Sequence, residues 1–307
     1  MKKLFLLLFL IFFISCDSNF DFPLPENNLP PAPDPFDENI DPPVNSYGLA
    51  DSYCYGIHVP VDYNVAEIDY DIEGFPDSHD LSSLLPRVGS QGNQGSCVAW
   101  AAGYYLKSFQ ENLEDLNNGE FLVNNAMSPA FVYNQIKVGD CKDGSRISDA
   151  LDLILNTGIV TWEEMPYNAN DCGTEPTVNQ NILAMPNKIN SFSYLDGEVL
   201  FEQTKAFLLD NKPVVIAISI DNDFFGVFEG NGDAVYRNFG KVDGAHAMLV
   251  VGYDNTKTAF KVVNSWGRNW GNDGFVWIDY KAFLEVMDPE SDFKILCEAW
   301  VSEDINI

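Results

Sequence analysis

Cys97 could act as a nucleophile. It follows a glycine-rich polar loop, and residues 91–100 read Gln-Gly-Asn-Gln-Gly-Ser-Cys-Val-Ala-Trp. Behind it, apolar residues recur at positions 98, 102, 106, 109 and 113, and Lys107, Gln110 and Glu111 lie off this stripe. The spacing predicts a helix of about sixteen residues with Cys97 in its first turn. There the unpaired backbone N–H groups and the helix dipole favour a thiolate over a thiol. Such a nucleophile needs a base, a group that orients the base, and donors for an oxyanion.

One histidine is a candidate for that base. The sequence contains three histidines, and His58 and His79 precede the part of the chain that has the composition of a folded domain. His246 remains, 149 residues after Cys97 and at the start of an apolar run. A lone histidine beside an apolar run is more often structural than catalytic, so the assignment depends on its context.

A block rich in tryptophan and glycine provides this context. Residues 264–275 read Asn-Ser-Trp-Gly-Arg-Asn-Trp-Gly-Asn-Asp-Gly-Phe and begin eighteen residues after His246. With the Gln…Gly-Ser-Cys loop and the late histidine, this block resembles a papain-family cysteine peptidase over roughly residues 80–301. The resemblance implies that Cys97 is the nucleophile and that His246 holds and returns the proton. It implies that Asn264 orients the imidazole and that Gln91 donates its amide to the oxyanion, beside the backbone N–H of Cys97.

The sequence also departs from the family's pattern at three positions. Gln94 stands where a second cysteine is usual, Val98 where an aromatic residue follows the nucleophile, and Ala245 where Asp or Asn commonly precedes the histidine. These departures resemble the bacterial branch of the family. Trp266 is kept, and the resemblance implies that it covers the hydrogen bond between the orienting amide and the imidazole.

The resemblance also implies where a substrate binds. Residues 143–147, Asp-Gly-Ser-Arg-Ile, occupy the place of the family's Gly-Gly segment, which pairs with the substrate backbone. We expect the substrate-binding residues to be Gly144, Ser145, Ile147, Ala245 and Ala247. Their apolar side chains favour an apolar residue two positions before the scissile bond.

Helical patterns come first in the domain and strand patterns follow. Helices are predicted from Pro129, with Ser128 as N-cap, to about Ile136, in a stripe from Ile147 to a stop at Gly158, and more weakly over 198–210. Apolar runs predict strands over 214–220, 246–253, 259–264, 275–280 and 294–301. We therefore expect an α+β fold with two lobes and the site between them. The resemblance specifies a papain-like fold, with a helical N-terminal lobe and an antiparallel, β-barrel-like C-terminal lobe.

The N-terminus has the features of an export signal. Residues 1–15 contain a basic start and an unbroken apolar run of eleven residues, from Leu4 to Ile14, too short to span a bilayer. Cys16 follows directly, so the segment resembles a bacterial lipoprotein signal with Cys16 as the lipidated residue. An ordinary secretory signal cut nearby is the alternative. We expect a lipid-anchored protein of the bacterial cell envelope, on the outer membrane or the cell surface.

Three further segments are expected after this signal. Residues 16–46 are rich in Pro and Asp and predict an extended tether. Residues 47–79 predict an arm with a strand over about 53–65, which packs on the domain or covers its active-site groove. Residues 80–307 form the peptidase domain.

Six cysteines need assignment in an oxidising compartment. If Cys16 carries lipid and the reactive thiol is set aside, four remain, which could form two disulfides in three ways or stay as thiols. We favour Cys141–Cys172, because both lie in polar, turn-rich stretches of one segment. Cys54–Cys297 is then left by elimination.

Charge and histidine count limit the partners. A formal net charge of −29 argues against nucleic acid, which binds through Lys and Arg. Three scattered histidines offer no metal-binding cluster, and we expect no cofactor. We predict a monomeric peptidase that acts on peptides or proteins and meets a membrane only through its lipid. The alternatives are a catalytically silent surface binding module, or a thiol transpeptidase or peptidoglycan amidase.

Overall fold

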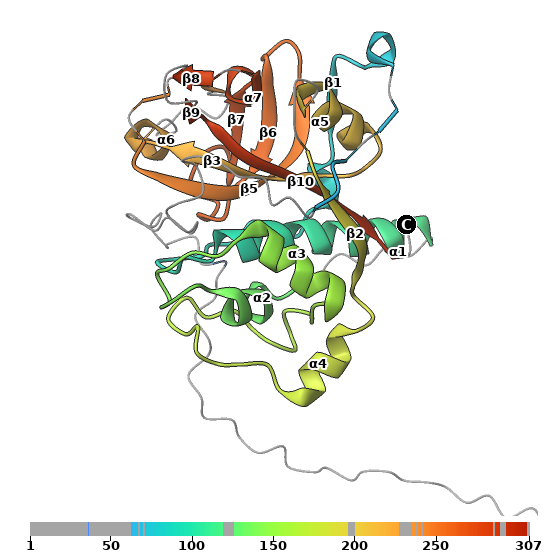
Figure 1. Ribbon diagram of the computed structural model, residues 1–307, viewed down its shortest axis with the longest axis vertical. Helices are drawn as coiled ribbons and strands as arrows, with labels where there is room; N and C mark the ends of the chain where they lie inside the picture. Colours follow the sequence, from blue (N-terminus) through green and yellow to red (C-terminus); the bar gives the residue numbers. More distant parts are fainter. Residues whose placement is uncertain are drawn as a thin grey trace, which may run out of the picture. The chain divides into compact units, whose positions relative to one another are not determined.

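The computed structural model describes Phe36 and residues 63–66, 68–69, 71–118, 126–195, 200–226, 235–237, 239–240, 242–284, 286–288 and 293–305. The predicted signal, Cys16, Cys54 and all of the predicted tether except Phe36 lie outside the described residues. Within them, helices and strands divide into a helical lobe and a β lobe (Figure 1), so the predicted two-lobed α+β fold is confirmed. No helix among the described residues is long and apolar enough to cross a membrane.

The helical lobe is built around the helix that follows the nucleophile. This helix comprises η3 (Ala99–Lys107), which is π-helical, and α1 (Ser108–Asn117), and it lies between the sheet and α2 and α3 (Figure 1). The other helices of this lobe are α2 (Pro129–Ile136), α3 (Ile147–Asn156) and α4 (Val178–Ala184). As predicted, Ser128 caps α2 by accepting from the Phe131 N–H, and Gly158 ends α3 with a positive φ of 89°.

The β lobe is a sheet with the order β2-β10-β3-β5-β6-β7-β4, and β1 pairs with β5. Its pairs are antiparallel except for β4 with β7. The strands are β1 (Ser78–Asp80), β2 (Ile189–Tyr194), β3 (Val214–Ile220), β4 (Val235–Tyr236), β5 (Gly244–Asp254), β6 (Ala259–Val263), β7 (Phe275–Asp279) and β10 (Leu296–Asp304). The short strands β8 (Val286–Asp288) and β9 (Phe293–Lys294) form a separate pair.

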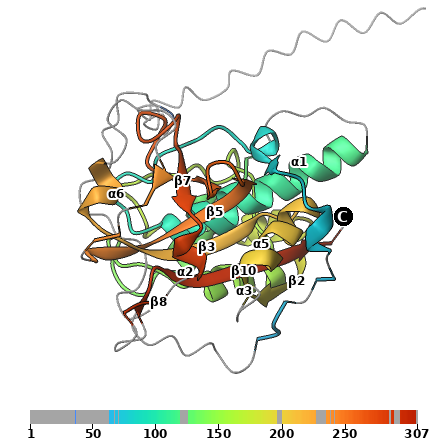
Figure 2. The same cartoon turned by 90° about the horizontal axis from the view of Figure 1, so that it is seen from above.

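Short helices complete the lobe. They are α5 (Leu200–Leu209), α6 (Asn222–Gly226) and α7 (Lys281–Leu284), and two 3₁₀ turns, η1 (Ile72–Gly74) and η2 (Ser82–Leu84), precede the nucleophile loop. Seen from above, the η3–α1 helix runs beneath the strands (Figure 2). Strand β5 contacts η3 directly, so the strand that carries the predicted base packs on the helix that follows the predicted nucleophile.

The described part of the predicted arm packs on the β lobe. The Tyr63 ring contacts Trp300 in an edge-on arrangement at 5.1 Å, and its hydroxyl donates to Asp152 at 3.0 Å. Val65 forms a parallel bridge with Tyr194, and β1 adds its three residues to β5. Residues 63–66 and 78–80 are therefore integrated into the fold of the domain.

The nucleophile's helix differs from the prediction in length and burial. Helical conformation runs from Cys97 to Asn117, and every residue of η3 is buried, so its first half has no solvent-facing side. The predicted polar positions Lys107 and Gln110 are buried as well. That expectation was wrong because strand β10 supplies polar partners: Gln110 donates to the Ser302 hydroxyl at 3.0 Å, and Lys107 meets a carboxylate.

A buried ion pair thus joins this helix to β10. Lys107 Nζ lies 2.9 and 3.0 Å from the two carboxylate oxygens of Asp304, with both side chains almost fully buried, and it also pairs with Glu111. Burial raises the pKa of Glu111, and the charge of Lys107 opposes this rise. A buried charge is tolerated only when it is paired, so these residues fix the register between helix and strand.

We predict that Lys107→Met lowers the free energy of unfolding by about 3–5 kcal/mol, because it leaves the Asp304 carboxylate buried without its cation. Adding Asp304→Asn should restore most of that loss, since the uncompensated charge is then removed. Urea unfolding followed by circular dichroism measures both variants. Equal losses in the single and the double variant would contradict the assignment of this ion pair.

Candidate active site

The nucleophile loop is held by backbone contacts that require glycine. Helical structure starts at Cys97, and the Trp100 N–H donates to the Ser96 carbonyl at 3.1 Å. Just before the helix, the Gly95 N–H donates to the Cys141 carbonyl at 2.9 Å. A Cβ at Gly95 would lie 2.6 Å from the carbonyl oxygens of Lys142 and Asp143, so only glycine permits this approach.

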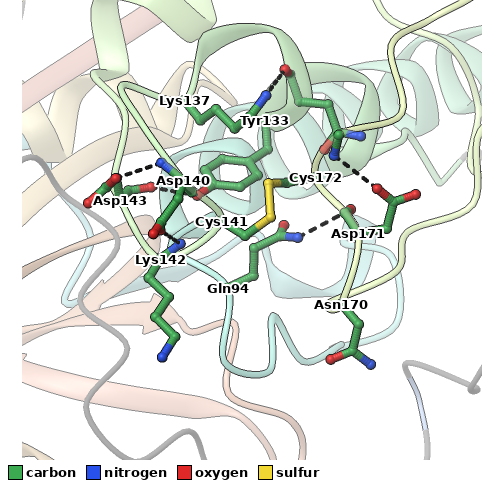
Figure 3. Close-up of a disulfide and its surroundings, with 12 residues drawn as sticks. Gln94, Tyr133, Lys137, Asp140, Cys141, Lys142, Asp143, Asn170, Asp171 and Cys172 are labelled. Carbon is green, nitrogen blue, oxygen red and sulfur yellow. Dashed lines mark hydrogen bonds between the residues drawn. A yellow bond between two sulfur atoms is a disulfide. The ribbon is translucent and has the colours of Figure 1, made fainter.

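A disulfide lies beside this loop. Cys141 and Cys172 are bonded, as the sequence predicts, across a separation of 31 residues. Figure 3 shows Gln94 next to them, where the family has a cysteine; its amide donates to the carbonyls of Asn168 and Asp171 at 3.3 and 3.4 Å. Hydrogen bonds from Gln94 therefore anchor the loop where the family uses a covalent bridge.

The other cysteines are placed as follows. Cys97 is a thiol and is fully buried. Cys297 is disulfide-bonded, and its partner lies outside the described residues, so the pairing with Cys54 stays a prediction.

The strand that carries the predicted base contacts the nucleophile through its backbone. His246 is the third residue of β5, and the N–H of the next residue, Ala247, donates to Cys97 Sγ at 3.3 Å. The imidazole Nε2 lies 2.7 Å from Asn264 Oδ1, which also accepts from the Ser265 N–H at 2.7 Å. Because an amide oxygen only accepts, Nε2 carries the proton; the buried Nδ1 has no hydrogen-bond partner among the described residues, so its lone pair is available to act as a base.

The predicted oxyanion donor is fixed by its neighbours. Gln91 Oε1 accepts from the Ser265 hydroxyl at 2.6 Å, and Gln91 Nε2 donates to the Gln94 carbonyl at 2.9 Å. The amide nitrogen has two hydrogens, so one remains for an oxyanion. Tyr167 donates to the Gln91 carbonyl at 2.8 Å and bonds Ser96 at 2.7 Å, which holds both ends of the loop.

Trp266 occupies the place that the resemblance implies. Its ring centroid lies 4.7 Å from that of His246, and Phe225 of α6 stacks on it at 4.8 Å with an interplanar angle of 5°. The tryptophan is fully buried. It therefore keeps water from the imidazole and strengthens the hydrogen bond to Asn264 by lowering the local dielectric.

Burial dominates the electrostatics of the site. Gln91, Cys97, His246 and Asn264 are each 0% exposed. Burial lowers the pKa of His246 to about 4, and the hydrogen bond to Asn264 opposes this shift. In this closed arrangement the imidazole is neutral near pH 7, which suits a base.

The predicted substrate-binding residues differ in burial and in their contact with Cys97. Ile147 and Ala247 belong to the same buried apolar cluster as Cys97, and the half-buried Ala245 packs against this cluster. Gly144 and Ser145 follow the disulfide turn, and the buried Ser145 hydroxyl has no partner among the described residues. Among these residues, Ala247 contacts the Cys97 sulfur, and substrate binding by the set stays a prediction.

Three contacts of the site were not predicted from the sequence. They are made by Tyr167, by the Ser265 hydroxyl and by Tyr105, which donates to the Asn264 carbonyl at 3.0 Å. Tyrosine and serine are common in cores and turns, so only the adjacency of Ser265 to Asn264 was a usable signal. In the part of the chain that the structure describes, no group of His, Cys, Asp or Glu could hold a metal ion.

A two-lobed α+β fold with a cysteine, a histidine and a carboxamide at the lobe boundary defines a papain-like cysteine peptidase. The family model of papain family cysteine proteases matches residues 75–287, and the chain belongs to this family.

Curated relatives agree with this membership. The chain is 27% identical over 209 residues to "Probable cysteine protease RDL2" from Arabidopsis thaliana, covering 66% of this chain and 54% of that protein. It is 26% identical over 210 residues to "Zingipain-2" from Zingiber officinale, covering 66% and 87%. The chain thus spans about half of the first relative and most of the second.

Solved structures show the same fold. The crystal structure of xylellain, a cysteine protease from Xylella fastidiosa, matches with a TM-score of 0.67 at 22% identity, covering 85% of this chain and 99% of that one. The Carica candamarcensis cysteine protease CMS1MS2, in complex with E-64, matches with a TM-score of 0.55 at 20% identity, covering 75% and 99%. The papain-like fold is therefore confirmed.

We predict that His246 titrates near pH 4 in a Cys97→Ala protein, in which the titration of the cysteine is removed. Its folded pKa is then below the unfolded value of 6.5, so the unfolded state binds more protons and stability falls as pH drops from about 6.5 to 4. Adding His246→Gln should remove that part of the loss. Ring NMR shifts and urea unfolding at each pH provide the measurements, and a ring pKa of 6.5 or above would contradict the effect of burial.

Proposed function

We propose that the chain is an exported, lipid-anchored cysteine peptidase that hydrolyses peptide bonds through a thioester on Cys97. The single observation that carries the catalytic part of the proposal is the pair of contacts made by adjacent residues of β5: Ala247 with Cys97 at 3.3 Å and His246 with Asn264 at 2.7 Å. Family membership supports the peptidase class. A bacterial neighbour in structure supports the bacterial branch of the family.

In the first half of the reaction, His246 Nδ1 takes the thiol proton of Cys97, and Sγ attacks the scissile carbonyl carbon. A C–S bond forms, and the carbonyl electron pair moves to oxygen. Gln91 Nε2 and the Cys97 backbone N–H donate to this oxyanion, whose charge they stabilise. The oxyanion collapses, the C–N bond breaks, and the imidazolium gives its proton to the leaving amine.

In the second half, water replaces the amine. His246 removes a proton from water, which attacks the thioester carbonyl through a second oxyanion. The C–S bond breaks, the peptide acid leaves, and the sulfur regains its proton from the imidazolium. Asn264 accepts from Nε2 throughout, so the ring keeps one orientation in both halves.

The export and anchoring part of the proposal is supported by the sequence alone. Residues 1–16 contain a basic start, an apolar core and a cysteine in the order of a lipoprotein signal. The charge of −29 suits a solvated domain outside the cell. Metabolic labelling with a fatty acid, abolished by Cys16→Ser, tests it.

We predict that Cys97→Ala abolishes peptide hydrolysis while the protein stays folded. Gln91→Ala should lower kcat by about 100- to 1,000-fold, since it removes one oxyanion donor. Asn264→Ala should cost less than loss of Cys97, because the amide orients and does not react. Steady-state kinetics on a peptide library compares the variants.

Gln110→Ala is the matched control for these variants. It deletes a buried amide with a hydrogen bond of 3.0 Å to Ser302, in the same helix but away from the thiol, so kcat should stay unchanged. Labelling with a thiol-directed peptidyl epoxide separates a peptidase from a silent binding module. A protein that neither turns over peptides nor labels selectively at Cys97 is not the proposed enzyme.

We also predict that deleting residues 17–62 raises the rate at which Cys97 is alkylated and peptides are cleaved, if the arm occludes the site. The deletion stops at residue 62 because residues 63–66 and 78–80 pair with strands of the domain. The comparison is with the full mature chain under the same conditions. Unchanged rates would eliminate occlusion by the arm.

A further inference from the structure

Tyr105 connects the nucleophile's helix to the residue that orients the base. It lies eight residues after Cys97 in η3 and is buried, and the proposed chemistry makes no use of it. Its hydroxyl donates to the Asn264 carbonyl at 3.0 Å and accepts from the Gly89 N–H at 3.3 Å. One phenol oxygen thus joins the helix, the Asn264 segment and the segment that leads to Gln91.

The position of this hydroxyl is fixed by packing. The Tyr105 ring lies 4.9 Å from Tyr104 and 6.2 Å from Trp100, centroid to centroid, within the core of the helical lobe. Burial raises the pKa of Tyr105, so its proton is retained at any working pH. The hydroxyl is therefore a permanent donor at a defined point.

Asn264 depends on that donor for its main-chain position. Its N–H donates to the Gly274 carbonyl at 3.0 Å, and its side-chain oxygen is shared by His246 and Ser265. The carbonyl of Asn264 is the remaining backbone group, and Tyr105 is its partner. Without the hydroxyl, this buried carbonyl would lack its hydrogen bond, and the Asn264 segment would shift to satisfy it.

We propose that Tyr105 is a positioning residue, which holds Asn264, and through it the imidazole of His246, in register with the sulfur of Cys97. The inference rests on the proposed function, because the register matters only if the pair reacts. The hydroxyl faces backbone groups, so its loss should affect kcat and leave KM unchanged. The Asn264 hydrogen bond raises the pKa of His246, so a looser Asn264 should let that pKa fall.

The test compares Tyr105→Phe with Tyr104→Phe. Tyr104 is the neighbouring buried tyrosine, and its hydroxyl donates to the Arg87 carbonyl at 2.6 Å, so each variant loses one hydroxyl bonded to a backbone carbonyl. Tyr105→Phe should lower kcat about tenfold, the size of one lost hydrogen bond, with KM unchanged. It should also move the acid limb of the pH profile of kcat/KM to lower pH, because His246 then remains a neutral base at lower pH. Tyr104→Phe should move neither quantity, although both variants are expected to be less stable.

A second readout keeps the proposal independent of peptide turnover. The rate of Cys97 alkylation by iodoacetamide against pH reports the same thiol and imidazole, and its acid limb should shift in Tyr105→Phe alone. The positioning role would be overturned if the pH profiles of Tyr105→Phe matched those of the wild type, or if both variants shifted equally. Selective alkylation of the wild type without any peptide cleavage would instead count against the proposed function.

Discussion

The site depends on the pairing of two short backbone segments that belong to different lobes. The Gln91 N–H donates to the Ser265 carbonyl at 2.8 Å, and the Gly267 N–H donates to the Gly89 carbonyl at 3.1 Å. Between them, Ser90 and Trp266 form an antiparallel bridge. These bonds fix the amide of Gln91 and the amide of Asn264 relative to each other. The oxyanion donor and the group that orients the imidazole are therefore positioned together. The Ser265 hydroxyl adds a side-chain bond to the same pairing.

Burial sets a second constraint, which opposes the chemistry. A thiolate and an imidazolium are each costly in a site that excludes water, and burial lowers the pKa of His246 to about 4. The closed site therefore favours the neutral imidazole of His246, which can act as a base. Access and ionisation are coupled as a result, because any movement that admits a substrate also admits water and makes the charged pair less costly.

The sequence predicted the long, regular elements and the ends of several of them. Val214–Ile220 forms β3 with the predicted bounds, and Ser128 and Gly158 cap their helices as expected, because these signals are local. It did not predict the burial of Lys107, since its partner Asp304 is 197 residues away and periodicity does not identify long-range ion pairs. The contacts of Tyr105 and Tyr167 were missed for the same reason: a tyrosine in a core pattern does not reveal which backbone group its hydroxyl will meet.

The position of Gln94 shows how a family's covalent feature can be replaced by weaker contacts. A cysteine there would tie the nucleophile loop to its neighbour by one bond, whereas Gln94 uses an amide that reaches the Asn168 and Asp171 carbonyls. The loop is still linked to a disulfide, because the Gly95 N–H bonds the carbonyl of Cys141, whose sulfur is joined to Cys172. The Cys141–Cys172 disulfide thus orders the segments that the loop packs against, and the loop itself is held by hydrogen bonds.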